Sequence, residues 1–170
     1  MEYVQVTNEN IEQEHICCAI SNDKDVQVSS KKAWLQDRFA EGLVFLKSVE
    51  RGKCFIEYIP AENAWNPISA DGYMYIDCLW VSGSFKGHGY STDLLDACIA
   101  DSKAKGKYGL CILAASKKKP FLADPKFLKH KGFLPVTKQT TAFSCGICLS
   151  IVMHRCQDSR NVRSIPISTN

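Results

Sequence analysis

The sequence predicts a single α/β (α+β) domain, with a mixed, mostly antiparallel sheet of six to seven strands and helices on both faces. The first observation is length, because 170 residues fit one domain with a substantial core. The second is the stretch 73–115, whose pattern predicts strand, glycine-rich loop, helix and strand, a right-handed crossover between parallel strands. The third is the stretch 43–59, where two apolar runs flank Arg51-Gly52 as in a β-hairpin.

The N-terminal part predicts one strand and two helices. Residues 3–6 alternate apolar and polar side chains, as a short strand does. Residues 7–10 offer helix caps, and apolar positions recur at helical spacing over 11–20, so we expect a first helix there. After a polar connection over 21–30, residues 31–41 predict a second helix that ends at Gly42.

The central elements follow from β-branched and aromatic runs. Strands are expected over 43–49 and 53–59, and an irregular connection over 60–72 follows them. The run 73–81 is expected to pair antiparallel with 53–59, and 108–115 to pair parallel with 73–81.

The C-terminal part predicts a short helix, two strands and a tail. Pro125 suits the first turn of a helix over 124–131. Residues 133–138 and 143–153 are apolar enough for two further strands. Residues 157–170 are polar, so we expect a domain over 1–156 and a disordered tail over 157–170.

Composition narrows the class of protein. The 45% hydrophobic and 23% charged residues are typical of a soluble globular domain. A net charge of +3 without a basic, aromatic-rich stripe argues against nucleic-acid binding, and no apolar run approaches the ~20 residues that span a bilayer. Residues 1–10 lack an apolar leader, so the nine cysteines are expected to be free thiols in a reducing, cytoplasmic setting.

Two cysteine and histidine clusters carry metal-ligand residue types. One comprises Cys145, Cys148, His154 and Cys156, and the other His15, Cys17 and Cys18. The odd separation of Cys145 and Cys148 places them on opposite faces of a regular strand, and His15 with Cys18 is equally a plain helix face. We therefore expect no metal site.

The loop between the strand 73–81 and the following helix carries the clearest functional signal. Gly83, Gly87 and Gly89 precede apolar positions at helical spacing, so the loop leads into a helix N-terminus. Such a loop presents backbone N–H groups to an anion, and glycine lets a phosphate approach the backbone. Lys86 stands beside the second glycine, and further lysines cluster at 117–119 and 126–131, which suits a phosphorylated ligand.

The amino-acid sequence of this loop resembles a motif of a known family. Residues 84–89, SFKGHG, with Leu94-Leu95 after them, resemble the acetyl-CoA motif Q/R-x-x-G-x-G/A of the GNAT N-acetyltransferases, with Ser84 in place of glutamine or arginine. Gly132-Phe133 is similar to a pair that precedes a late strand in the family. Residues 55–65 look like a bacterial subgroup that often carries a thioredoxin-like C-terminal segment. This chain has no room for that segment, so we expect an altered end to the sheet.

The resemblance implies N-acetyl transfer from acetyl-CoA, as co-substrate, to a small amine. It implies that main-chain groups of Leu79, Trp80 and Val81 pair with the pantetheine, in a cleft where the strands 73–81 and 108–115 splay. An amide near Leu79 would polarise the thioester carbonyl. The loop would hold the pyrophosphate through Ser84, Phe85, Lys86, Gly87, His88, Gly89, Tyr90 and Ser91.

Amine acetylation also needs a base, and two carboxylates are candidates. Glu57 and Asp77 each stand alone as the carboxylate in an apolar strand, with Glu57 the preferred one. Burial would raise their pKa values towards the working range of a base. Alternatively, Glu57 faces solvent or pairs with a lysine.

The acid that protonates the leaving thiol is missing from its usual place. Many family members have a tyrosine four residues before the Gly-Phe glycine, where this chain has Leu128. Ser116, Tyr75, Cys78 or water are the alternatives. A non-catalytic acyl-CoA-binding module and a cysteine-based thiol or metal sensor therefore remain open as functions, and a homodimer remains open as the assembly.

Overall fold

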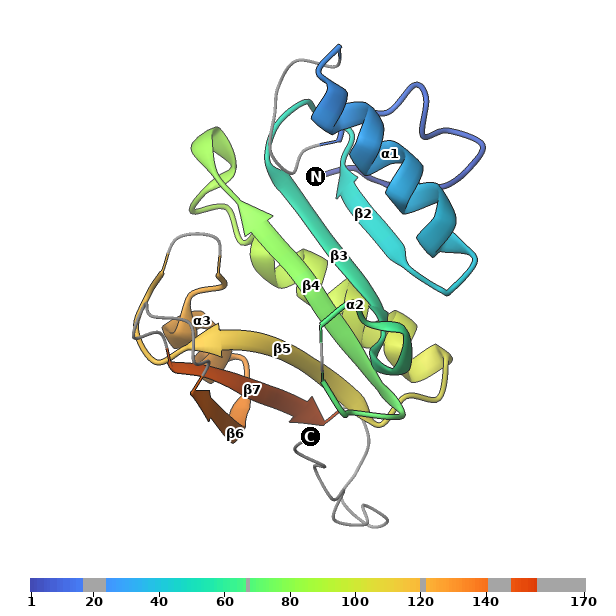
Figure 1. Cartoon of the computed structure of the whole chain (residues 1–170). Coiled ribbons are helices and arrows are strands. Elements are labelled where there is room, and N and C mark those ends of the chain that lie inside the picture. The colour runs from blue at the N-terminus through green and yellow to red at the C-terminus, as the bar shows by residue number, and fades with distance from the viewer. Residues whose placement is uncertain (17–23, 67, 120–121, 141–147, 156–170) are drawn as a thin grey trace.

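A computed structural model describes residues 1–16, 24–66, 68–119, 122–140 and 148–155, with side chains left out for 136–140 and 148–155. In this part of the chain, seven strands form one sheet in the order β1-β2-β3-β4-β5-β7-β6 (Figure 1). Their bounds are β1 Tyr3–Val6, β2 Val44–Ser48, β3 Cys54–Pro60, β4 Tyr73–Val81, β5 Gly109–Ala115, β6 Leu134–Thr140 and β7 Cys148–Arg155. Neighbouring strands are antiparallel except β4 and β5, which are parallel.

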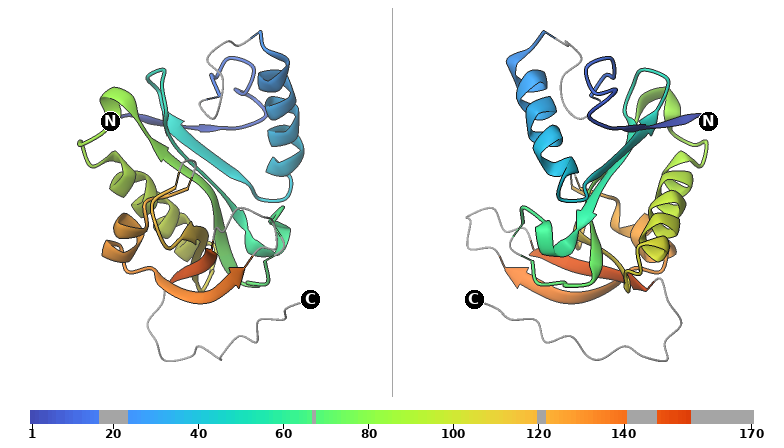
Figure 2. Two further views of the ribbon diagram at one scale, coloured as in Figure 1. Left: turned by 60° about the vertical axis from the view of Figure 1, so that its left-hand side comes forward. Right: turned by 90° about the vertical axis from the view of Figure 1, so that its right-hand side faces the viewer.

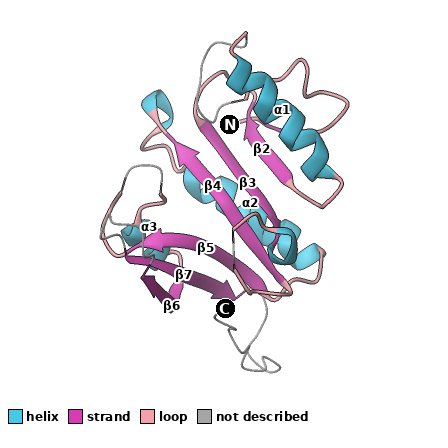
Figure 3. Ribbon diagram, in the orientation of Figure 1, coloured by secondary structure: helices cyan, strands magenta, loops and turns pink. Residues whose placement is uncertain are grey.

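Helices cover both faces of the sheet, as Figures 2 and 3 show. Helix α1, Val26–Phe39, lies on one face, while α2, Tyr90–Ala104, and α3, Pro125–His130, lie on the other. Each face has its own buried cluster: Leu35, Phe45 and Phe55 belong to the α1 side. Leu94, Leu95 and Leu128 belong to the α2 side. The predicted fold class, the hairpin and the parallel crossover are therefore confirmed.

The middle of β4 contains an extra residue. Glu57 of β3 lies opposite Cys78, and Tyr58 lies opposite Ile76, so Asp77 has no partner in the ladder. Such a bulge places two successive side chains on one face and shifts the alternation beyond it. Tyr75 belongs to the cluster on the α1 side, and Cys78 packs against the same cluster. They are three residues apart, whereas in a regular strand residues on one face are separated by two or four. Asp77 itself is exposed.

Two expectations for the N-terminal part are wrong. The first helix, expected over 11–20, is replaced over 8–13 by turns; residues 17–20 lie outside the described residues. The Asn10 side chain holds these turns, because its Oδ1 accepts from Thr7 N at 2.8 Å and its Nδ2 donates to Gln5 O at 2.9 Å.

The prediction of a polar connection over 21–30 was also wrong, because helix α1 already begins at Val26. Asp25 caps it by accepting from Gln27 N at 2.8 Å. Only Val28 and Leu35 of this helix are fully buried, so its first turns lack the apolar stripe that would have predicted them from the sequence.

The C-terminal elements agree with the sequence as far as they are described. Helix α3 begins after Asp124, which accepts from Lys126 N at 2.8 Å, with Pro125 in the first turn. Strands β6 and β7 occupy the two predicted stretches. Residues 143–147 of the last predicted strand, and the tail 157–170, lie outside the described residues.

Candidate functional site

The site is a gap in the sheet between β4 and β5. Their ladder runs from Tyr73–Gly109 to Ile76–Ile112 and stops there, although both strands continue. Strand β4 is bent at this point by the Asp77 bulge, whereas β5 stays paired with β7 along its whole length. The predicted splay between the two strands is confirmed (Figure 1).

A cavity of about 450 Å³ occupies the outer part of this gap. One wall is β4, from Cys78 to Val81. Lys86 and Ser91 come from the loop and the start of α2, and the facing wall is formed by the segment between β5 and α3 together with the first turn of α3. That wall consists of Lys118, Leu122, Ala123, Asp124 and Phe127.

The glycine-rich loop closes the outer end of the cavity. Gly83, Gly87 and Gly89 have φ of 63°, 83° and 83°, the left-handed region that favours glycine. A Cβ at any of the three would meet no heavy atom within 4 Å, so the space over the loop backbone is open. Gly89 is the N-cap of α2, whose first N–H groups have no partner within the helix. The loop therefore fits the approach of a phosphate.

The loop is fixed from below by Phe85. This side chain is 7% exposed and belongs to the cluster on the α2 side. A Cβ at Gly52, in the β2–β3 turn, would lie 2.3 Å from the Phe85 ring, so the hairpin turn packs directly on it. Tyr90 contacts the Phe85 ring edge-on at 6.3 Å. Phe85 thus anchors the loop while its neighbours stay exposed.

Nine of the eleven predicted cofactor residues fall into two groups, and the other two, Phe85 and Tyr90, pack together beneath the loop. Leu79, Trp80, Val81, Lys86 and Ser91 line the larger cavity. Ser84, Gly87, His88 and Gly89 lie exposed in the loop, and His88 stacks on Tyr90.

The wall between β5 and α3 was not predicted as part of the site. The lysine cluster at 117–119 pointed to the region, but nothing in the sequence indicated that Leu122 to Phe127 fold across the gap. Lys118 Nζ lies 3.6 Å from Asp124 Oδ2, so this wall carries an internal ion pair at the cavity.

A smaller cavity of about 200 Å³ lies at the inner end of the gap. It shares Cys78, Leu79, Leu122 and Ala123 with the larger one, so the two meet beside the bulge. Its polar lining is Asn66, Tyr75 and Asp77, and its remaining lining is Ile112 and Leu113. Tyr75 and Leu113 belong to or pack on the α1-side cluster, whereas Ile112 and Leu79 do so on the α2 side. The cavity therefore passes between the two faces of the sheet.

The two candidate bases lie in different environments. Asp77 is exposed and lines the smaller cavity. Glu57 is 0% exposed, and its Oε1 lies 2.8 Å from Lys31 Nζ of α1. Glu57 faces Cys78 across the ladder, one strand away from both cavities. Pairing with a lysine was the alternative that the sequence left open for Glu57.

The three candidates for the thiol acid are also separated. Ser116 is exposed and is absent from the lining of both cavities. Tyr75 and Cys78 line the smaller cavity. Burial, together with the nearby Asp77 charge, raises the pKa of Tyr75, so its hydroxyl stays protonated at neutral pH. Leu128, at the family's tyrosine position, is 2% exposed in the core and offers no proton.

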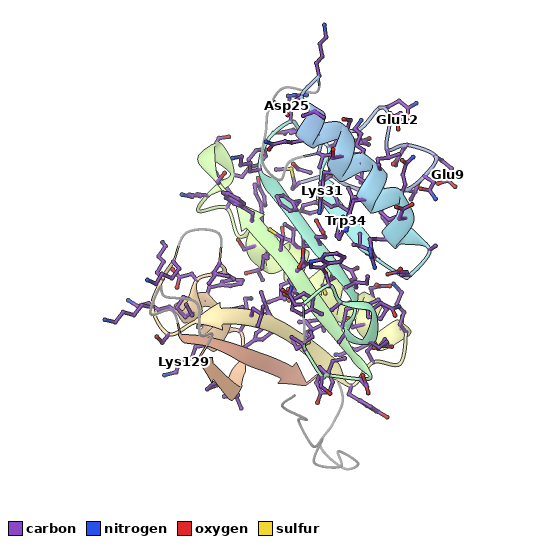
Figure 4. All side chains as sticks on the ribbon, in the orientation of Figure 1. Glu9, Glu12, Asp25, Lys31, Trp34 and Lys129 are labelled. Atoms are coloured by element: carbon purple, nitrogen blue, oxygen red, sulfur yellow. The ribbon has the colours of Figure 1, made fainter. Side chains whose placement is uncertain are left out.

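All three tryptophans of the chain gather on the α1 side of the site, each beside a cation. Lys31 Nζ lies 3.8 Å from the Trp34 ring centre, and Figure 4 shows both side chains on α1. The Arg38 guanidinium lies 5.7 Å from the Trp65 ring, and Lys53 Nζ lies 4.8 Å from the Trp80 ring. Trp65 is 77% exposed, next to Asn66 of the smaller cavity.

The other sequence features can be placed in part. Within the described ranges no three His, Cys, Asp or Glu side chains come together to hold a metal, and both suspected clusters extend outside those ranges. Cys54, Cys78, Cys98 and Cys111 are free thiols. None of the described helices combines the length and the hydrophobicity that crossing a bilayer requires.

Comparison with known proteins agrees with the geometry. Residues 8–120 match the acetyltransferase (GNAT) family. The uncharacterized N-acetyltransferase YoaP of Bacillus subtilis (strain 168) is 52% identical over 134 residues, which cover 78% of this chain and 53% of that protein. The chain thus spans about half the length of that relative.

Solved structures show the same fold at low identity. A ribosomal-protein-alanine N-acetyltransferase from Brucella melitensis has a TM-score of 0.63 at 16% identity, over 91% of this chain and 99% of that chain. A putative acetyltransferase from Salmonella typhimurium, solved with its cofactor acetyl-CoA, has a TM-score of 0.60 at 17% identity, over 96% of this chain and 99% of that chain. Since the family match extends over well more than half of the sequence, the chain belongs to the acetyltransferase (GNAT) family.

Proposed function

We propose that this protein transfers an acetyl group from acetyl-CoA to the amine of a small acceptor. The observation that carries the proposal is the open glycine loop at the head of α2, which leads directly into the cavity between β4 and β5. Membership of the GNAT family and the acetyl-CoA found in the Salmonella typhimurium structure support the choice of co-substrate.

The residues present fit acetyl-CoA along the whole gap. The loop N–H groups of Gly87 to Tyr90, with Lys86, would hold the pyrophosphate, because no Cβ crowds the backbone there. Lys118, on the opposite wall, adds a second positive charge. Beyond Ile76 the edge of β4 no longer pairs with β5, so Leu79 to Val81 offer main-chain groups to the pantetheine as an added strand would.

The chemistry requires one bond to form and one to break. The amine nitrogen bonds to the thioester carbonyl carbon, the carbon–sulfur bond breaks, the nitrogen gives up a proton, and the thiolate gains one. We assign the proton from nitrogen to the Asp77 carboxylate, which lines the smaller cavity, with Glu57 held behind Cys78 by Lys31 as the second candidate base. The Leu79 amide would polarise the carbonyl.

The leaving thiolate can take its proton from Cys78 or from water, so Ser116 is not needed as the acid. Cys78 lines both cavities, and water can reach the same point through the open end of the gap. A thiol donor has nearly the same pKa as the leaving group, so the transfer is close to thermoneutral. The lack of a tyrosine at position 128 therefore does not prevent turnover. We place the protein in the cytoplasm, because none of the four cysteines whose side chains are described forms a disulfide, and a homodimer stays open.

The proposal is tested by titrating acetyl-CoA calorimetrically and by following thiol release with a panel of amines. Gly87→Ala and Gly89→Ala should weaken acetyl-CoA binding by at least about tenfold, or about 1.4 kcal/mol, because the new methyl group occupies the open space over the loop.

The matched control is Gly106→Ala. Gly106 has φ of +68° and open space around it like the loop glycines, but it lies after the C-terminal end of α2, about 22 Å along the helix. All three variants should lose similar stability, and only the loop variants should lose affinity. Equal acetyl-CoA affinity in all three would reject the loop as the cofactor site. Tight binding without thiol release for any amine would leave a non-catalytic acyl-CoA-binding module.

A further inference from the structure

The smaller cavity has polar groups on one side and hydrocarbon on the other. Asn66, Tyr75 and Asp77 supply the polar side, from the α1 face of the sheet. Leu79, Ile112, Leu113, Leu122 and Ala123 supply the apolar side. Among the described residues that line this cavity, Asp77 is the only one that carries a charge, so this part of the lining is negative where it is polar.

The polar groups are held by hydrogen bonds among themselves. Asn66 Nδ2 donates to the Tyr75 hydroxyl oxygen at 2.7 Å and approaches Asp77 Oδ1 at 3.5 Å. The amide therefore fixes the direction of both neighbours. The Tyr75 oxygen accepts from Asn66, which leaves its O–H as a donor towards a ligand.

The volume limits what can enter beside the thioester. About 200 Å³ corresponds to roughly six or seven water molecules at ~30 Å³ each. A short aliphatic chain fits this space. The aliphatic walls favour methylene groups, because apolar surface gains from leaving water.

We propose that the acceptor is a primary amine at the end of an aliphatic chain, and that Asp77 selects against an amine with a carboxylate on the adjacent carbon. This substrate class rests on the function proposed above. Asp77 attracts the ammonium form as it arrives. The ammonium loses one proton to water, because only the neutral amine has a lone pair for attack, and Asp77 takes the second proton, which the nitrogen releases as the amide forms. A carboxylate on the adjacent carbon would lie against the carboxylate of Asp77, and like charges at such a distance are strongly disfavoured.

Two isomeric probes separate this class from the alternative. Nα-acetyl-lysine offers its amine at the end of four methylene groups, and Nε-acetyl-lysine offers an amine beside its carboxylate, with the same atoms and the same net charge. We expect kcat/KM for Nα-acetyl-lysine to be higher by about tenfold or more. n-Butylamine, which has no carboxylate, should also be acetylated.

Two variants test whether the smaller cavity determines the preference between the two isomers. Asp77→Asn should raise KM for Nα-acetyl-lysine and should reduce the preference between the isomers to less than about threefold, because the repelling charge is gone. Asp71→Asn is the control, since Asp71 is exposed just before β4 and outside both cavities. Leu113→Phe should lower kcat/KM for both isomers while the Kd for acetyl-CoA stays unchanged, because Leu113 lines the smaller cavity alone.

The outcomes distinguish this inference from the proposed function. Equal turnover of the two isomers, or a preference for Nε-acetyl-lysine, overturns the substrate class and leaves the acetyltransferase intact. A preference that survives Asp77→Asn overturns the role of Asp77. Failure of acetyl-CoA to bind, or thiol release with none of the amines, overturns the proposed function and this inference with it.

Discussion

Lys31→Met is expected to destabilise the fold through Glu57, and the structure sets the magnitude. Lys31 Nζ lies 2.8 Å from Glu57 Oε1, and Glu57 is 0% exposed while the Lys31 side chain is 25% exposed. Removing one partner of a buried pair costs about 3–5 kcal/mol. Because water reaches a quarter of Lys31, we expect a smaller loss, about 2–3 kcal/mol. For a chain of this length the melting temperature would then fall by about 4–12 °C.

The assay is urea unfolding followed by circular dichroism, with Lys32→Met as the control. Lys32 is the next residue of α1, and its Nζ bonds the Glu12 carbonyl oxygen at 3.1 Å on the exposed side of the helix. Methionine keeps the aliphatic stem of Lys31 beside the Trp34 ring, so the change removes the charge and little packing. The double variant Lys31→Met/Glu57→Met should regain at least about 1 kcal/mol, since an apolar pair replaces the ionic one. A Lys31→Met protein within about 0.5 kcal/mol of wild type, or a double variant less stable than both single ones, would refute the reasoning.

Three further predictions concern catalysis, pH and thiol reactivity. With Asp77 as the assigned base, Asp77→Asn should lower kcat by roughly 10²- to 10⁴-fold with unchanged Kd for acetyl-CoA, and Glu57→Gln should retain most of its turnover; the opposite result would make Glu57 the base. Burial, with Lys47 and Arg51 nearby, lowers the pKa of His15, so the unfolded chain binds its proton first. Unfolding free energy should thus fall as pH drops below about 6.5, by at most about 1.4 kcal/mol per pH unit, and His15→Gln should flatten that slope in urea titrations. Partly exposed Cys78 should react with iodoacetamide before buried Cys111, because burial raises the pKa of Cys111 to about 12. Acetyl-CoA should slow the labelling of Cys78, measured by mass spectrometry. Equal labelling rates for Cys78 and Cys111 would contradict the assigned burial.

Local signals were enough for the centre of the fold. Strand β4, the glycine loop and α2 are contiguous, and each has its own pattern of apolar spacing, so their order and type followed from the sequence. The hairpin β2–β3 was equally clear, because a glycine turn joins two apolar runs. At the N-terminus the strand over 3–6 and most of α1 were predicted, but the expected first helix and the start of α1 were wrong for opposite reasons. Residues 11–20 have helical spacing, but 8–13 form turns held by Asn10, while the start of α1 is too polar to show an apolar stripe.

The sequence predicted the lining residues that belong to β4 and the glycine loop, but not the residues of the wall that folds against them. The lining from Leu79 to Ser91 was found, but Leu122 to Phe127 reach the gap through a tertiary contact that spacing does not reveal. The bulge at Asp77 was also invisible, because one extra residue in a strand leaves no mark in an apolar run. The partner of Glu57 comes from α1, 26 residues earlier, and several lysines could have served equally well by sequence.

The gathering of tryptophans on one face gives the protein built-in optical reporters. Indole emission from Trp34, Trp65 and Trp80 arises from the α1 side of the sheet, while the α2 side contains no tryptophan. Trp80 lines the larger cavity, so its emission should respond when that cavity fills. Trp65 is 77% exposed beside the smaller cavity, so an arriving acceptor should shift its emission to shorter wavelength as water is displaced. With single-tryptophan variants, occupancy of the two halves of the gap could be followed separately, without a label and in real time.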